Sequence, residues 1–167
     1  MNFRLNRSGV WPLAAVLMLT GTAFAASSSY QAFGLTPQSR EADRLLRDIR
    51  SDARQVRTHA WRWDRLSING TATWQQSDRQ WNQIKPAVED MQIKLGRIEA
   101  MLATLPAWER STIASTRPLV DLIARNTHDL RVMLDKPNVN LTSTRSQRRS
   151  GSLAVEAGRL VRTERSA

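Results

Sequence analysis

Apolar residues recur at alternating spacings of three and four along most of the chain, the pattern of a buried stripe on a helix. In the first such segment, residues 36–67, the repeat gives two rows: Ala42, Ile49, Val56 and Trp63, and Leu45, Asp52, His59 and Leu66. Similar stripes run through residues 74–105 and 113–134. No segment alternates apolar and polar residues with the period of two that is typical of strands. The pattern predicts long, packed helices.

Local signals define where these helices begin and end. Thr36 followed by Pro37 is typical of a helix start, with Thr as the N-cap and Pro in the first turn. The pair Asn69-Gly70 indicates a turn, and Pro106 separates the second helix from the third. The predicted helices cover about residues 36–67, 74–105, 107–134 and 145–162. Because the connections are short, neighbours are antiparallel. The predicted fold is all-α, an antiparallel up-down bundle of three long helices and a shorter C-terminal helix.

Two prolines lie inside the predicted helices. Pro86 and Pro118 both fall on the outer face, where water can hydrate the carbonyl groups that a proline leaves without a partner. We therefore expect continuous, kinked helices, with a break at each proline as the alternative. The side chains of Trp63, Trp74 and Trp81 are expected to fill the end of the bundle near the first turn.

Asp52 and His59 occupy positions of the apolar stripe. A buried polar group needs a partner, so each is expected to meet another helix or water. Turns near residues 70 and 106 place His59 level with Trp81, Trp81 level with Arg131, and His128 within about one turn of that level. One interpretation is that these groups fix helix pairing. The alternative is a metal or haem site built from His59, His128 and Asp52.

The first 25 residues follow the order of a secretory signal peptide. Arg4 and Arg7 precede a short apolar run, residues 10–20, and small residues follow. The expected cleavage site is defined by Ala23, Ala25 and Ala26. The alternative is an uncleaved anchor, for which the run is short. The predicted organisation is a signal peptide (1–25), a flexible lead (26–35) and a helical bundle domain (36–165).

Charge and cysteine content limit the chemistry. The chain has 25 Lys+Arg and 15 Asp+Glu, a net charge of +10. Removing Arg4 and Arg7 lowers this by two, to about +8. An arginine excess favours phosphate or carboxylate partners, although GC-rich coding explains it equally well. The absence of cysteine excludes disulfides, lipid attachment at a cysteine, CxxCH haem attachment and thiol catalysis.

The outer face of the first predicted helix carries an arginine row that ends in a tryptophan. Its residues are Arg47, Arg50, Arg54, Arg57 and Trp61. Guanidinium groups bind phosphate or carboxylate, and an indole packs on apolar surfaces. Anionic lipid, lipopolysaccharide or acidic glycan is therefore the expected partner, without specific recognition of nucleic acid. The alternative is a solvated face, with Trp61 covered by the C-terminal helix or by a second copy of the chain.

Three longer segments resemble uncharacterised secreted, all-helical proteins of soil bacteria, acidobacteria especially. They are "LRDIRSDARQVRTHAWRWDRL", "IKPAVEDMQIKLGRIEAM" and "RPLVDLIARNTHD", and the resemblance covers most of residues 40–134. It implies a helical fold but no activity and no site residues. "LTPQS", residues 35–39, is similar to the LTxxQ motif of Spy/CpxP-type periplasmic chaperones, with Ser39 in place of Gln. The early Met and late His of periplasmic b-type cytochrome bundles are missing.

These observations favour a non-enzymatic binding module, periplasmic or secreted, without a cofactor. Enzyme motifs are missing, namely a Gly-rich phosphate loop, G-x-S-x-G and HEXXH. The alternatives are a metal- or haem-binding bundle and a Spy/CpxP-like chaperone. A homo-oligomer is compatible with all three interpretations.

Overall fold

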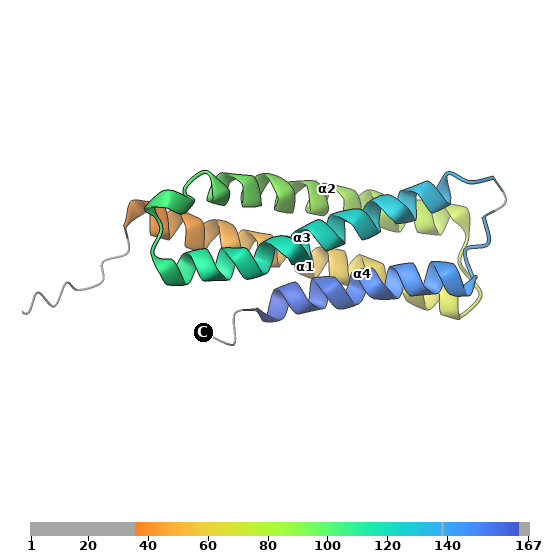
Figure 1. The fold of residues 1–167 in the computed structure, drawn as a ribbon. Helices are drawn as coiled ribbons and strands as arrows, with labels where there is room; N and C mark the ends of the chain where they lie inside the picture. Colours follow the sequence, from red (N-terminus) through yellow and green to blue (C-terminus); the bar gives the residue numbers. More distant parts are fainter. Residues whose placement is uncertain (1–35, 138, 164–167) are drawn as a thin grey trace, which may run out of the picture. The chain divides into compact units, whose positions relative to one another are not determined.

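The computed structural model describes residues 36–137 and 139–163, and within them it shows an all-α bundle (Figure 1). The helices are α1 (Pro37–Ile68), α2 (Trp74–Glu99), α3 (Ala107–Leu134) and α4 (Thr144–Arg162), with a short 3₁₀ turn, η1 (Leu102–Thr104), before α3. The predicted signal peptide, its cleavage site and the flexible lead lie outside the described residues. In the part of the chain that is described, no helix is long and apolar enough to cross a membrane.

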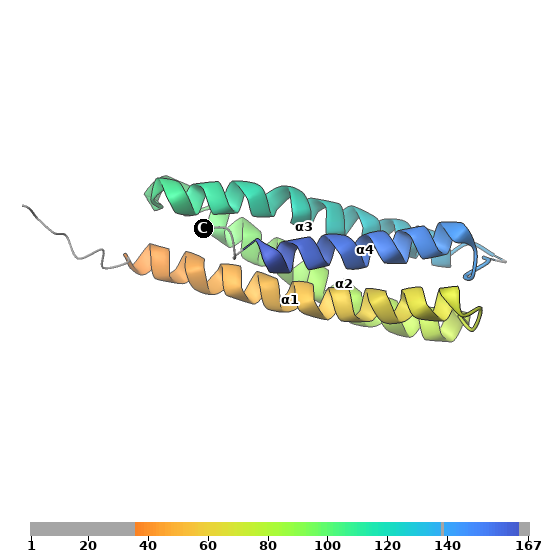
Figure 2. The same cartoon turned by 90° about the horizontal axis from the view of Figure 1, so that it is seen from below.

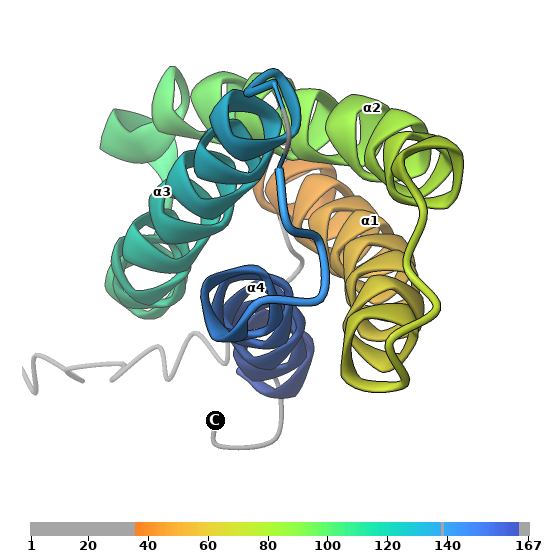
Figure 3. The same cartoon turned by 90° about the vertical axis from the view of Figure 1, so that its right-hand side faces the viewer.

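Consecutive helices pack against one another, and α4 returns to pack against α1 (Figure 2). The view along the bundle shows the four helices around a common core, with α1 diagonal to α3 (Figure 3). This arrangement confirms the predicted all-α bundle. It also gives every helix two neighbours, so each needs an apolar stripe wider than the seam of a two-helix coiled coil.

Side-chain caps explain three of the four helix starts. The hydroxyl oxygen of Thr36 accepts a hydrogen bond from the backbone N–H of Ser39, as the sequence predicts. Thr73 and Gln76 form a reciprocal capping box at the start of α2. The Ser143 hydroxyl accepts from the backbone N–H of Ser146 at the start of α4.

The end of the second helix differs from the prediction. The α-helix ends at Glu99 rather than near Leu105, and η1 follows it. An α-helix continued to Pro106 would need a proline N–H for the carbonyl of Leu102, and proline has none. Proline also disfavours helical geometry at the preceding residue, and Leu105 has extended dihedral angles (φ −87°, ψ 146°).

Pro86 and Pro118 lie inside continuous helices, which confirms that neither proline breaks its helix. Both prolines are exposed, as expected from their outer positions. The prediction for the tryptophans is correct for Trp63, which is fully buried, and wrong for Trp74, which is 49% exposed. Trp74 is the first residue of α2, so its side chain lies at the open end of the bundle rather than between helices.

Candidate basic face on α1 and α4

The predicted arginine row on α1 divides into three environments. Arg54 and Arg57 are exposed, and Trp61 is 53% exposed, so α4 does not cover it. Arg47 is also exposed, but its guanidinium bonds the carboxylate of Asp43 at 2.7 Å. Arg54, Arg57 and Trp61 therefore remain accessible to a partner.

Arg50 corrects the sequence prediction, because its side chain is buried (6% exposed). The prediction placed it on the outer face by assuming that only two heptad positions of α1 are covered. The structure also buries a third row on the side that meets α4, and its members are Leu46, Ala53, Ala60 and Ser67. Arg50 borders this row at a spacing of three residues from Ala53. It is engaged within the protein and does not belong to the accessible face.

Two glycines mark the line along which α4 meets α1. A Cβ on Gly158 would lie 3.6 Å from Cδ of Arg57, and a Cβ on Gly151 would lie 3.6 Å from Oδ1 of Asp64. The hydroxyl of Ser150 donates to that same carboxylate oxygen at 3.1 Å. Arg57 is thus level with Gly158, and Asp64, seven residues later on α1, is level with Gly151, seven residues earlier on α4. These two pairs define the register of the antiparallel helices.

This register brings additional exposed residues of α4 beside the α1 row. Val155 lies four residues after Gly151 and three before Gly158, so it shares their side of the helix. Arg148 and Arg162 lie seven residues on either side of Val155 and are exposed. We define the α1/α4 face by these exposed residues together with their neighbours on α1: Arg54, Arg57, Trp61, Arg65, Ile68, Arg148, Val155 and Arg162.

The α4 contribution was missed at the sequence level. The seven-residue repeat of Arg148, Val155 and Arg162 was a usable signal, but the side of α4 that faces α1 is set by packing. By helix propensity alone, Gly151 and Gly158 would only weaken a helix. In the structure they mark the surface of α4 that lies against α1.

The α1/α4 face is strongly positive. Among the described residues, none of its five arginines forms an ion pair with a carboxylate. Asp64 borders the face, but it is half-buried and accepts the Ser150 hydrogen bond. The guanidinium of Arg65 lies 4.6 Å from the centre of the Trp61 ring, a cation–π distance. Trp61 and Arg65 therefore present an aromatic ring and a cation together.

The three residues proposed for a metal or haem site, His59, His128 and Asp52, lie in different surroundings. Nδ1 of His59 lies 2.9 Å from Oε1 of Gln80 on α2. Because an amide oxygen only accepts, the histidine donates this bond. Asp52 accepts a hydrogen bond from Lys94 at 2.5 Å, and His128 is exposed on α3. Across the described ranges, no three His, Cys, Asp or Glu residues are grouped so that they could hold a metal ion.

Burial controls the titration of Asp52. It raises the pKa of the carboxyl above its ordinary value near 3.8. The hydrogen bond and the charge of Lys94 act in the opposite direction but do not cancel the effect of burial. The bond with Lys94 joins Asp52 on α1 to α2, as expected if the polar residues of the stripe fix helix pairing.

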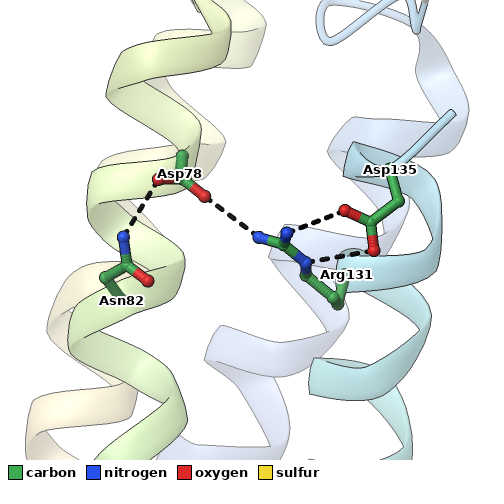
Figure 4. A network of polar contacts seen from close by, with 4 residues as sticks. All are labelled: Asp78, Asn82, Arg131 and Asp135. Atoms are coloured by element: carbon green, nitrogen blue, oxygen red, sulfur yellow. Dashed lines mark hydrogen bonds and ion pairs between the residues drawn. The ribbon is translucent and has the colours of Figure 1, made fainter. Parts of the chain in front are cut away.

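A second cluster of charges lies between α2 and α3. The guanidinium of Arg131 bonds Asp78 at 3.0 Å and Asp135 at 2.8 Å, and Asp78 also accepts from Asn82 (Figure 4). The same guanidinium lies 4.6 Å from the centre of the Trp81 ring. This contact confirms the prediction that Trp81 and Arg131 lie at the same height along the bundle. His59 bonds Gln80, the residue before Trp81, which confirms the prediction that His59 and Trp81 lie at the same height.

A shallow groove of about 320 Å³ adjoins this cluster and is lined by Trp81, Lys85, Ala124, His128 and Arg131 among others. Its charged groups are already engaged: Arg131 bonds two carboxylates, and Lys85 lies 3.6 Å from Glu89. The α1/α4 face differs because none of its arginines is paired with a carboxylate in the part of the chain that the structure describes. Comparisons of the chain with known protein families, with curated proteins and with solved structures find no match.

Proposed function

We propose that this protein is an exported, non-enzymatic helical module that binds anionic components of the cell envelope through its α1/α4 face. The observation that carries the proposal is a group of five exposed arginines on two adjacent helices, none of which forms an ion pair with another described residue. Each guanidinium offers a planar fork of donors that matches a phosphate or carboxylate group. Acidic partners gain several such contacts at once.

The positive net charge alone would attract polyanions to any surface of the molecule. The test must therefore compare arginines of the α1/α4 face with the same number of arginines elsewhere. Arg79, Arg97 and Arg125 on α2 and α3 are also exposed and make no ion pairs among the described residues. Each of them has a counterpart on the face at a similar place within its helix. Arg79 and Arg148 lie near helix starts, Arg97 and Arg65 lie in last turns, and Arg125 and Arg54 lie in the interior of their helices.

The experiment compares two triple variants that have the same net charge. Arg54→Gln, Arg65→Gln and Arg148→Gln remove three cations from the face, and Arg79→Gln, Arg97→Gln and Arg125→Gln remove three from elsewhere. We expect the face variant to lose at least about tenfold in affinity for heparin, with the control near wild type. Binding by the wild type should weaken steeply with salt, because the attraction is screened. Equal losses in the two variants would reject the face.

Export is the second part of the proposal, and it rests on residues 1–25. The protein recovered from the periplasm or the medium should begin at Ala26 when its N-terminus is sequenced. A product that retains Met1 and stays in the inner membrane would show that the leader is an anchor. This result is independent of heparin binding, so the two parts of the proposal can fail separately.

A further inference from the structure

The α1/α4 face contains exposed apolar side chains among its arginines. Trp61 is 53% exposed, Ile68 is 61% exposed and Val155 is 51% exposed. Trp61 and Ile68 are seven residues apart and lie on one side of α1. In the sequence, Trp61 lies between Arg57 and Asp64, and Val155 lies between Gly151 and Gly158. A Cβ on Gly158 would meet Arg57, and a Cβ on Gly151 would meet Asp64. Trp61 and Val155 therefore lie at about the same level along the two adjacent helices.

The aliphatic members of this group discriminate between anionic partners. A glycan or a nucleic acid offers sugars and bases on which an indole can stack, but it offers little to Ile68 and Val155. A lipid bilayer presents phosphate groups directly above hydrocarbon. It therefore satisfies guanidinium groups and apolar side chains on the same surface, as it does for basic amphipathic helices that lie in the interface.

We propose that the α1/α4 face docks flat on an anionic phospholipid bilayer. Because α1 and α4 are adjacent and antiparallel, both helices lie along the membrane surface. Trp61, Ile68 and Val155 enter the boundary between headgroups and acyl chains, while the surrounding arginines bind lipid phosphates. Arg65, stacked on Trp61, holds a cation at the level of the headgroups. This inference rests on the proposed function, because it names the partner of the same face.

The test separates apolar insertion from charge. The chain contains a matched set of exposed apolar residues elsewhere: Trp108 is 54% exposed, Ile93 is 56% exposed and Val132 is 46% exposed. The first variant carries Trp61→Gln, Ile68→Gln and Val155→Gln. The control carries Trp108→Gln, Ile93→Gln and Val132→Gln. Both triple variants keep the wild-type charge, and circular dichroism verifies that both remain folded.

Binding is measured by co-sedimentation of the chain, as purified from expressing bacteria, with two kinds of vesicle. One contains phosphatidylcholine alone, and the other contains about 30% phosphatidylglycerol. We expect binding to the anionic vesicles and little to the neutral ones. The apolar face variant should bind anionic vesicles at least about tenfold more weakly than wild type. It should lose much less affinity for heparin, because only Trp61 of the three side chains can stack on sugars. The control should match wild type in both assays.

The outcomes distinguish the two proposals. Wild-type binding of anionic vesicles by the apolar face variant would overturn the bilayer inference and leave the anion-binding face intact. So would a wild-type chain that binds heparin but neither kind of vesicle. If the arginine variant of the face matches its own control on heparin and on vesicles, the proposed function itself fails. Loss of vesicle binding in both the apolar and the arginine face variants, with both controls unaffected, supports the docked bilayer.

Discussion

Lys94 on α2 donates a hydrogen bond to the carboxylate of Asp52 on α1 across 2.5 Å. Both side chains are mostly covered, with 21% of Lys94 and 12% of Asp52 exposed. Removing one partner leaves the other charge poorly solvated and without its bond. We predict that Lys94→Met lowers the free energy of unfolding by about 2–3 kcal/mol.

The double variant tests whether the loss comes from the orphaned charge. Replacing Asp52 with Leu in the Lys94→Met background removes both charges from the interface, and its stability should lie close to that of wild type. Lys85→Met is a suitable control, because Lys85 forms an exposed pair with Glu89 and should cost less than about 0.5 kcal/mol. Urea unfolding curves measure all three. A double variant as unstable as the single one would contradict the explanation.

The raised pKa of Asp52 allows us to predict how the stability of the protein depends on pH. Its pKa is raised in the folded protein, chiefly by burial, so the folded state holds the proton more tightly than the unfolded state. The resulting stabilisation is complete below the unfolded value near 3.8 and is lost as pH rises through the raised folded value. We therefore predict that the stability of wild type relative to Asp52→Asn falls over this acidic range. Urea unfolding at several pH values measures the difference, and a difference that is constant or rises with pH would contradict the prediction.

Most of the fold was predictable because its determinants are local or periodic. The heptads gave the helices, Thr36 and Pro37 gave the start of α1, and the outer positions of the two internal prolines explained continuous helices. Short turns even gave the register, as the bond of His59 to Gln80 shows. The end of α2 was missed because Pro106 acts on residues before it, and the prediction treated it as a break at one position.

The candidate site was only partly predictable, because it depends on where α4 docks. A helical wheel of α1 alone placed Arg50 with Arg54 and Trp61, although packing buries Arg50. The same wheel could not show that Arg162 joins the face, because Arg162 lies on α4. Which side of α4 meets α1 depends on packing such as the approach of Gly158 to the Arg57 side chain, and these residues are about a hundred positions apart.

Arg131 joins α3 to α2 and also supports the last turn of its own helix. Its guanidinium bonds Asp78 across the interface and Asp135 one turn away, and it covers the Trp81 ring (Figure 4). Because 35% of the Arg131 side chain is exposed, each interaction is weakened by water, but the three share one ordered group. We predict that Arg131→Gln lowers the free energy of unfolding by about 1–2 kcal/mol.

Arg117 provides the matched control, since it also joins α3 to α2 through one ion pair with Glu99 at 3.3 Å. Its side chain is 62% exposed, and its guanidinium lies over no aromatic ring of the described residues. Arg117→Gln should therefore change stability by less than about 0.5 kcal/mol. Thermal and urea unfolding compare the two variants at equal net charge. If both lose the same amount, the shared carboxylates and the Trp81 contact add nothing beyond an ordinary surface ion pair, and the role assigned to Arg131 is wrong.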